Sequence, residues 1–311
     1  MNKGMDLLSI HELSAADVEE ILTLAADLKA KQKAGIPHKL LAGKTLGMIF
    51  EKSSTRTRVS FEVGMYQLGG QALFLSSRDL QVGRGEPIKD TARVLSRYLD
   101  GIMIRTYGHE RIEELARYAD IPVINALSDL LHPCQALTDL LTIREYKGKN
   151  LAGLKMAYVG DGNNMTHSLM YAAAKVGMHF AAATPEGYEP NAEVVANAKA
   201  DATATGATIT VTHNPMEAVA GANVIVTDTW ASMGQEDEHD ARIACFRPYQ
   251  VNRELVAASG EACCIVMHCL PAYRGEEITD DVMEAFSDVI FDEAENRLHT
   301  QKAILALLMA D

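Results

Sequence analysis

The sequence lacks any long apolar run and has few aromatic residues. Its longest apolar stretch is about Ala303 to Ala310, well short of the ~18 residues that a membrane span needs. Aromatic side chains make up 6% of the chain and hydrophobic ones 48%, which is the composition of an ordinary globular protein. We therefore expect no transmembrane helix and no association with a membrane.

The sequence also lacks cysteine pairs at metal-binding spacing. The number of cysteines is odd and no CxxC pair occurs, so reduced thiols are expected rather than a disulfide or zinc framework. Residues 1–13 carry acids within a short apolar stretch and lack the core of a signal peptide. We expect a cytoplasmic protein without a metal or another cofactor. The cysteines are Cys134, Cys245, Cys263, Cys264 and Cys269.

Positive charge is scarce in the second half of the chain. Residues 1–150 hold 20 Lys and Arg against 19 Asp and Glu, whereas residues 151–311 hold 9 against 23, so the two parts carry net charges of +1 and −14. The whole chain, at −13, lacks the continuous basic surface that nucleic acid binding requires. The asymmetry indicates either two halves with different ligands or a charge that serves solubility alone.

The length of 311 residues predicts two domains, at roughly 100 to 200 residues each. Short apolar runs alternate with helical patterns, which is typical of parallel sheets covered by helices. We expect an α/β protein with two doubly wound parallel-sheet domains in tandem, linked by helices. The domains should span residues 1–147 and 151–293, with a C-terminal helix at about 294–311 that packs back on the first domain.

Local patterns predict the elements. A first helix begins at Ser14, with Asp17 as its capping partner, and another runs from His132 to Tyr146. Ligands of open parallel sheets lie beyond the carboxyl ends of the strands, so the loops there are expected to carry the chemistry. The predicted strands are Thr45–Phe50, Ala72–Leu75, Ile102–Arg105 and Pro122–Asn125, then Lys155–Val159, His179–Thr184, Thr208–Thr212, Val224–Asp228, Cys264–His268 and Val289–Phe291.

The segment from Glu51 to Arg58 combines hydroxyl side chains and arginines between a predicted strand and a predicted helix. Unpaired N–H groups and the positive end of the dipole at a helix N-terminus favour a phosphate group. The alternative is a helix cap with solvated arginines. Arg105 ends another strand, and His132-Pro133-Cys134-Gln135 begins a helix after a third one. Donors from three strand ends therefore converge on one predicted anion pocket.

The turn Gly160-Asp161-Gly162-Asn163-Asn164 follows a strand and imitates the start of a dinucleotide-binding fingerprint. Met165 stands at the third glycine position, and the next strand, which ends near Thr184, supplies no acid for a ribose hydroxyl. The pattern disfavours a nucleotide and favours a small polar ligand held by Asn164.

Two later strand ends also carry polar groups. The carboxylate of Asp228 suits an ammonium ligand, and Ser232-Met233-Gly234 is a candidate movable loop. His268 and Cys269 suggest a cysteine nucleophile or a metal site. Neighbouring residues of a strand point to opposite faces, however, which disfavours a nucleophile and base side by side, and zinc spacing is absent.

Together these motifs resemble the ornithine carbamoyltransferase family over nearly the whole chain, from about Asp6 to the final helix. Motifs like Ser54–Arg58 and His132–Gln135 are shared by all transcarbamoylases, whereas motifs like Ser232–Gly234 and His268–Pro271 point to ornithine. The resemblance implies transfer of the carbamoyl group of carbamoyl phosphate to the δ-amine of L-ornithine, which gives L-citrulline and phosphate in arginine metabolism. The motifs are Ser54-Thr55-Arg56-Thr57-Arg58, His132-Pro133-Cys134-Gln135, Asp228 with Ser232-Met233-Gly234, and His268-Cys269-Leu270-Pro271.

The resemblance also implies residue roles and an assembly. Gln81 would reach into a neighbouring subunit's site, which implies a homotrimer or a multiple of it with shared sites. The catalytic residues would be Arg56, Arg105, His132 and Cys269. Carbamoyl phosphate would bind Ser54, Thr55, Arg56, Thr57, Gln81, Arg105, His132, Gln135, Cys269, Leu270 and Arg297, and ornithine would bind Asn164, Asp228, Ser232 and Met233.

The uneven charge fits these two substrates. Carbamoyl phosphate is an anion and suits the less acidic half, whereas ornithine carries two ammonium groups and suits the half with net charge −14. A domain that binds aspartate would need cations for its two carboxylates, and the second half of the chain has few of them, which argues against aspartate. The alternatives are a related transcarbamoylase that uses putrescine or an N-acylated ornithine, a binding module without activity and, despite the incomplete glycine pattern, an NAD-dependent oxidoreductase.

Overall fold

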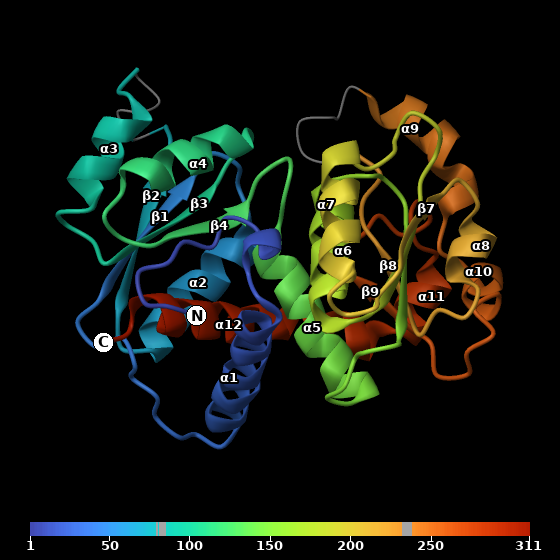
Figure 1. Cartoon of the computed structure of the whole chain (residues 1–311), viewed down its shortest axis with the longest axis horizontal. Helices are drawn as coiled ribbons and strands as arrows, with labels where there is room; N and C mark the ends of the chain where they lie inside the picture. Colours follow the sequence, from blue (N-terminus) through green and yellow to red (C-terminus); the bar gives the residue numbers. More distant parts are fainter. Residues whose placement is uncertain (79, 81–84, 232–237) are drawn as a thin grey trace. The chain divides into compact units, whose positions relative to one another are not determined.

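The structure is a computed structural model that describes residues 1–78, 80, 85–231 and 238–311 (Figure 1). The chain divides into two compact units. Unit 1 comprises Met1–Leu141 and Asn296–Asp311, and unit 2 comprises Thr142–Glu295. Each unit contains an all-parallel sheet with helices, which confirms the predicted α/β class with two parallel-sheet domains. Among the described residues, no helix is long and apolar enough to cross a membrane.

Unit 1 is built on a four-stranded sheet in the order β2-β1-β3-β4. The two central strands, β1 and β3, are buried along nearly their whole length, and their last residues, Phe50 and Arg105, are aligned. The loops that follow these strands therefore leave the same edge of the sheet side by side. The elements are η1 (Ile10–Glu12), α1 (Ala15–Lys33), β1 (Thr45–Phe50), α2 (Thr55–Gln67), β2 (Gln71–Ser76), α3 (Ile88–Leu95), β3 (Gly101–Arg105), α4 (His109–Tyr118) and β4 (Val123–Leu127).

Unit 2 is built on a five-stranded sheet in the order β7-β6-β5-β8-β9. Its core is mostly aliphatic, and the central pair β5 and β8 places the turn after β5 next to the turn after β8. The elements are β5 (Lys155–Val159), α6 (Asn164–Val176), β6 (His179–Ala183), α7 (Ala192–Ala202), β7 (Ile209–Thr212), α8 (Pro215–Val219), β8 (Val224–Thr227), α9 (His239–Phe246), η4 (Arg247–Tyr249), α10 (Arg253–Ala257), β9 (Ile265–His268) and α11 (Asp280–Ala285).

Two helices, α5 (Pro133–Lys147) and α12 (Ser287–Met309), have residues in both units, and the division of the units falls inside each of them. The polar stretch 147–150, where the sequence predicts the domain boundary, begins at the last residue of α5. The C-terminal part of α12 belongs to unit 1, so the last residues of the chain pack with the first ones.

One predicted element is wrong. Val289–Phe291, expected as a strand, lies in α12. A short apolar run has the same appearance in a buried strand and on the buried face of a helix. The helical period is visible only over a longer window, because Ile290, Glu293 and Arg297 are buried at intervals of three and four residues while Phe291 is exposed.

A lysine is buried in unit 1. Lys302 of α12 has no exposed surface, and its Nζ lies 3.1 Å from His38 Nε2 and 2.8 Å from Gln67 Oε1. His38 Nδ1 lies 2.9 Å from the carbonyl oxygen of Ile36, so it carries the ring proton and leaves Nε2 as an acceptor. Neither partner of the ammonium group is negatively charged. Burial consequently lowers the pKa of Lys302 to about 8.

This burial predicts a pH-dependent stability. Between pH 8 and the ordinary lysine pKa of about 10.4, the unfolded chain binds more protons at Lys302 than the folded chain does, so the stability of the folded state rises with pH. Lys302→Met removes this dependence. We expect the free energy of unfolding of the native chain to gain on the order of 1–3 kcal/mol relative to Lys302→Met across this window.

Chemical denaturation at several pH values measures this difference. Lys31→Met is the matched control, because the side chain of Lys31 on α1 is 40% exposed and pairs with Asp27 at 2.7 Å. The same pH trend in Lys302→Met and in the native chain would contradict the assignment.

Candidate active site

The predicted phosphate loop forms the start of α2 at the carboxyl end of β1. Ser54 is the N-cap residue, and its Oγ accepts a hydrogen bond from the backbone N–H of Thr57 at 3.2 Å. The two hydroxyl oxygens lie 3.1 Å apart. No acidic residue occurs in the first turn of this helix, so the positive end of its dipole is not offset locally. The local structure suits an anion.

The buried guanidinium of Arg297 joins three other predicted site residues. It donates to Thr57 Oγ1 at 2.9 Å and to Gln135 Oε1, and its Nη1 lies 3.5 Å from His132 Nε2. The amide nitrogen of Gln135 donates to Asp139 Oδ1 at 2.8 Å, which directs the amide oxygen to Arg297. Helices α2, α5 and α12 thus contribute to one polar cluster in unit 1.

His132 is held as a neutral imidazole in this cluster. Burial lowers the pKa of His132 well below its usual range, and the positive charges of Arg297 and Arg105 lower it further. Arg105 is the last residue of β3 and is itself buried, and its carbonyl oxygen accepts from the N–H of Glu51 at 2.9 Å. Two buried cations therefore act on one neutral histidine, an arrangement that suits a bound anion.

The remaining residues of this loop are nearer the surface. Thr55 is exposed and Arg56 is half-buried in the first turn of α2. Arg58 points elsewhere, because it pairs with Glu62 at 3.1 Å and lies 3.8 Å from the ring centre of Phe74. Of the two arginines in the loop, only Arg56 therefore stays a candidate ligand. Gln81, Ser232 and Met233, three further predicted site residues, lie outside the described residues.

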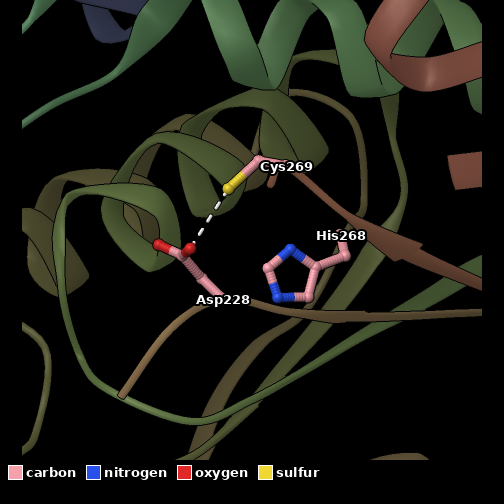
Figure 2. Close-up of side chains that lie close together, drawn as sticks. All are labelled: Asp228, His268 and Cys269. Atoms are coloured by element: carbon pink, nitrogen blue, oxygen red, sulfur yellow. Dashed lines mark hydrogen bonds between the residues drawn. The ribbon is translucent and has the colours of Figure 1, made fainter. Parts of the chain in front are cut away.

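In unit 2, Asp228 directly follows β8 and is the centre of a second polar group. Its Oδ1 accepts from the thiol of Cys269 at 3.2 Å and from the N–H of Thr229 at 2.8 Å. Its Oδ2 accepts from Asn163 Nδ2 at 3.1 Å. Figure 2 shows the Asp228 carboxylate and the Cys269 thiol pointing toward one another. Both residues were predicted from the sequence, but their contact was not.

Asn163, the neighbour of the predicted Asn164, contacts Asp228. Asn163 is the N-cap of α6, and its side-chain oxygen accepts from the N–H groups of Met165 and Thr166. Asn164 is the first residue of the helix and is half-buried. The preference of asparagine for N-cap positions is a sequence signal that identifies Asn163 as the structural member of the pair.

His268 lies beside this group but has other partners (Figure 2). Its Nδ1 accepts from the N–H of Leu270 at 2.9 Å, so Nε2 carries the proton and donates to Glu277 Oε1 at 2.9 Å. Ligand atoms of Asp228, His268 and Cys269 lie within 4.8 Å of one another, a grouping that suits a metal ion. Both ring nitrogens of His268 are already hydrogen-bonded, so this residue positions the chain rather than binding a metal.

Two buried glutamates, neither of them predicted as a site residue, hold the segment after β9. Glu277 Oε1 also accepts from the N–H of Tyr273 at 2.7 Å, and Glu293 Oε2 accepts from the N–H of His268 at 3.0 Å. Between them, Leu270 adopts the left-handed backbone conformation with φ of 58°, which costs a non-glycine residue roughly 1–2 kcal/mol. The hydrogen bonds of His268 offset this cost and fix the backbone of Leu270.

Family models match both parts of the chain. Residues 5–145 match the carbamoyl-P binding domain of aspartate/ornithine carbamoyltransferase, and residues 152–308 match its Asp/Orn binding domain. The chain belongs to the aspartate/ornithine carbamoyltransferase family.

Members of this carbamoyltransferase family resemble the chain over almost its full length. It is 59% identical to an ornithine carbamoyltransferase of Carboxydothermus hydrogenoformans, with 99% of this chain and 98% of that one covered. It is 56% identical to an anabolic ornithine carbamoyltransferase of Pyrococcus furiosus, covering 98% and 96%. The solved structure of ornithine carbamoyltransferase from Pyrococcus furiosus matches with a TM-score of 0.95 and 55% identity, covering 99% and 97%. The predicted family is confirmed.

The contacts of His268 predict different effects for two substitutions in this carbamoyltransferase. The side-chain oxygen of asparagine lies about as far from the backbone as Nδ1 of histidine does. His268→Asn therefore keeps an acceptor for the Leu270 N–H and loses the donor to Glu277. In His268→Gln the amide nitrogen lies about as far from the backbone as Nε2 of histidine does. The donor to Glu277 is therefore kept, and the Leu270 N–H loses its acceptor. Loss of one buried hydrogen bond amounts to about 1–3 kcal/mol.

Hydrogen exchange of the Leu270 amide measures the outcome. We expect exchange at least about tenfold faster in His268→Gln than in His268→Asn. Equal protection of this amide in the two variants would mean that His268 does not hold the backbone of Leu270.

Proposed function

We propose that the chain transfers the carbamoyl group of carbamoyl phosphate to the δ-amine of L-ornithine and releases L-citrulline and phosphate. The observation that carries this proposal is the buried Arg297 cluster at the N-terminus of α2, within the part of the chain that matches a carbamoyl-phosphate-binding domain. Relatives at 55–61% identity that bear the name ornithine carbamoyltransferase support ornithine as the acceptor.

In unit 1, the proposed ligands of carbamoyl phosphate surround the start of α2. The helix N-terminus and the Ser54 and Thr57 hydroxyls provide donors for the phosphate oxygens. Arg105 and Arg297 provide buried positive charge. The full proposed set is Ser54, Thr55, Arg56, Thr57, Gln81, Arg105, His132, Gln135 and Arg297 in the first part of the chain and its last helix, with Cys269 and Leu270 from the second part.

In unit 2, Asp228 is proposed to bind an ammonium group of ornithine, since its carboxylate is buried beside the neutral donors Asn163 and Cys269. Asn164, Ser232 and Met233 complete the proposed ornithine ligands. Cys269 and Leu270 would lie near the δ-amine, with the backbone of Leu270 fixed through His268.

The mechanism that follows is direct attack of the neutral δ-amine on the carbamoyl carbon. The carbon becomes tetrahedral, and collapse of this intermediate breaks the bond to the phosphate oxygen, while the attacking nitrogen gives up one proton to the departing phosphate. Arg56, Arg105 and neutral His132 would stabilise the negative charge that develops on oxygen, in the manner of an oxyanion hole. Because an alkyl amine has a pKa of about 10.4 in water, only a small fraction is neutral at pH 7, and the rate should rise with pH.

A related reaction on putrescine or an N-acylated ornithine is not favoured. Relatives at 59–61% identity are named for ornithine, and putrescine has no carboxylate for the proposed Asn164 and Met233 contacts. The relative from Pyrococcus furiosus named anabolic supports the citrulline-forming direction and a role in arginine biosynthesis.

We further propose that the chain acts as a homotrimer or a multiple of it. Unit 1 exposes large apolar side chains on α2, on the edge strand β2 and around α3. An exposed apolar surface beside an unpaired strand edge is typical of contacts between subunits. These side chains are Val59, Val63, Tyr66, Leu73, Phe74, Val94 and Tyr98. The cytoplasmic location stays a prediction from the sequence.

The experiment that tests the function compares acceptor amines. Citrulline formation is measured with carbamoyl phosphate and ornithine between pH 7 and 9, with putrescine, N-acetylornithine and aspartate in parallel. We expect a strong preference for ornithine and a rate that rises with pH. Preference for another amine would overturn the ornithine assignment and keep the phosphate site, and absence of turnover with every amine would overturn both.

A substitution tests the place of Arg56. If its guanidinium stabilises the charge that develops on oxygen, Arg56→Ala should reduce kcat by about 10²-fold or more, as the loss of one oxyanion-hole donor does. Arg117→Ala on α4 is the control, since Arg117 is an exposed arginine of the same unit. A loss below threefold in Arg56→Ala, about the scatter expected for a surface change, would remove Arg56 from the reaction.

A further inference from the structure

An acidic residue stands at the start of the loop that is proposed to hold the phosphate group. Glu51 directly follows β1 and precedes the N-cap Ser54 by three residues. Three residues of fully extended chain span at most about 11 Å, a distance over which like charges still repel one another at low ionic strength. The carboxylate of Glu51 therefore needs a counter-charge if this loop is to bind an anion such as carbamoyl phosphate.

The carboxylate of Glu51 is held by two residues that follow β3. Its Oε2 accepts a hydrogen bond from the hydroxyl of Thr106, and its Oε1 accepts one from Nη2 of Arg111 at 2.6 Å. Thr106 is fully buried and comes directly after Arg105, a proposed ligand of carbamoyl phosphate. The backbone N–H of Glu51 donates to the carbonyl oxygen of Arg105 as well. Glu51 thus ties the loop after β1 to the residues around Arg105, which accounts for an acid at this position.

Arg111 supplies the counter-charge. It is the third residue of α4, where the positive end of the helix dipole disfavours a cation, so the helix itself does not account for an arginine there. The side chain of Glu51 is 13% exposed and that of Arg111 is 35% exposed, so solvent screens the pair only in part. The printed contact of the guanidinium with Glu51 uses a single nitrogen, Nη2. The position of one positive charge therefore matters more here than the forked shape of the guanidinium.

The neighbouring lysine has a different partner. Lys52 Nζ pairs with Asp129 and lies 4.3 Å from the ring centre of Tyr107. Lys52 therefore links the loop after β1 to the loops after β3 and β4 rather than to Glu51. Within the part of the chain that the structure describes, Arg111 is the one cation that forms an ion pair with Glu51.

We propose that Arg111 is a positioning residue that holds the carboxylate of Glu51, offsets its charge and thereby sets the affinity of the loop after β1 for the phosphate group of carbamoyl phosphate. The identity of this ligand rests on the proposed function, whereas the pairing of Arg111 with Glu51 is a property of unit 1 alone. Arg111 itself does not touch the substrate, since its charge faces Glu51. Loss of the arginine leaves an unpaired carboxylate beside the site, and loss of both charges restores the balance.

The first experiment separates the two substrates. At low ionic strength we expect Arg111→Gln to raise the carbamoyl phosphate KM about fivefold or more, while the ornithine KM changes less than about twofold. Arg111→Lys keeps a positive charge within reach of Glu51, so its KM values should stay within about twofold of the native ones. Glu51→Gln keeps an acceptor for Thr106 and removes the charge. The double variant Arg111→Gln with Glu51→Gln should therefore recover a carbamoyl phosphate KM within about twofold of the native value.

Salt dependence separates an effect of charge from an effect of shape. The Debye length falls from about 30 Å at 0.01 M salt to about 3 Å at 1 M, so salt screens the repulsion between Glu51 and the phosphate group. The ratio of the carbamoyl phosphate KM of Arg111→Gln to that of the native chain should therefore fall below about twofold at high salt. A displaced loop would give the same ratio at every ionic strength.

The matched control is Arg117→Gln, because Arg117 is an exposed arginine of the same helix and its loss changes the net charge of the chain by the same amount. It should leave both KM values unchanged. Three results would overturn the proposal: a carbamoyl phosphate KM within twofold of the native value in folded Arg111→Gln, parallel changes in both KM values, or no recovery in the double variant. A KM ratio that stays constant with salt contradicts it as well.

The second experiment needs no turnover. Inorganic phosphate carries the same group as the substrate, and calorimetric titration measures its dissociation constant. We expect this constant to rise about threefold or more in Arg111→Gln and to return toward the native value in the double variant. If the native chain binds phosphate but does not carbamoylate ornithine, the proposed function is wrong and the titration still decides the role of Arg111. Equal phosphate affinity in the native chain and Arg111→Gln, or no phosphate binding by the native chain, overturns the role of Arg111.

Discussion

The candidate site depends most on the burial of the Arg297 guanidinium. A buried cation is costly unless its donors are hydrogen-bonded, and here Thr57, Gln135 and His132 surround it. These partners come from α2 and α5, more than 150 residues away in the sequence, so α12 has to return to unit 1 for the charge to be satisfied. These three partners are neutral, so they hold the guanidinium at the start of α2 without neutralising its positive charge. The guanidinium of Arg297 thus serves both the packing of α12 in unit 1 and the proposed binding of an anion.

Much of the fold is predictable because strands in parallel sheets are local apolar runs. β1 and β5 have the predicted bounds, and the capping box of Ser14 and Asp17 is present. The strand prediction at Val289–Phe291 was wrong for the same reason, because three consecutive apolar residues are too few to distinguish the period of a strand from that of a helix. Its helical character follows from Glu293 and Arg297, two charged residues on the buried face.

The site is predictable in its residues but not in its contacts. Motifs identify Asp228 and Cys269, whereas their hydrogen bond arises from the pairing of β8 with β9. Glu277 and Glu293 carry no motif, and their role depends on His268, which lies far from Glu293 in the sequence. To predict contacts of this kind between residues far apart in the sequence, one must know the register of the sheet, which cannot be read from a single sequence.

The acidic charge of the second half is not all available to a ligand. Part of it is internal: Glu277 and Glu293 are buried and hold the segment after β9, and Asp161 pairs with Arg242. These carboxylates are not available to a cationic substrate. Asp228 is a buried acid directly after β8 whose carboxylate accepts from a thiol, an amide and a backbone N–H. The argument for an ammonium ligand therefore rests on one residue rather than on the net charge.

The contact of Cys269 with Asp228 also decides between two roles for the thiol. In the hydrogen bond to Asp228 Oδ1 the sulfur is the donor, so it carries its proton. Activation of a cysteine nucleophile requires the opposite, a thiolate beside a base or a cation. The neighbouring imidazole of His268 already uses both ring nitrogens, and a carboxylate repels a thiolate. This geometry favours Cys269 as a neutral group that orients the carboxylate and the incoming amine, and a direct transfer needs no covalent intermediate on sulfur.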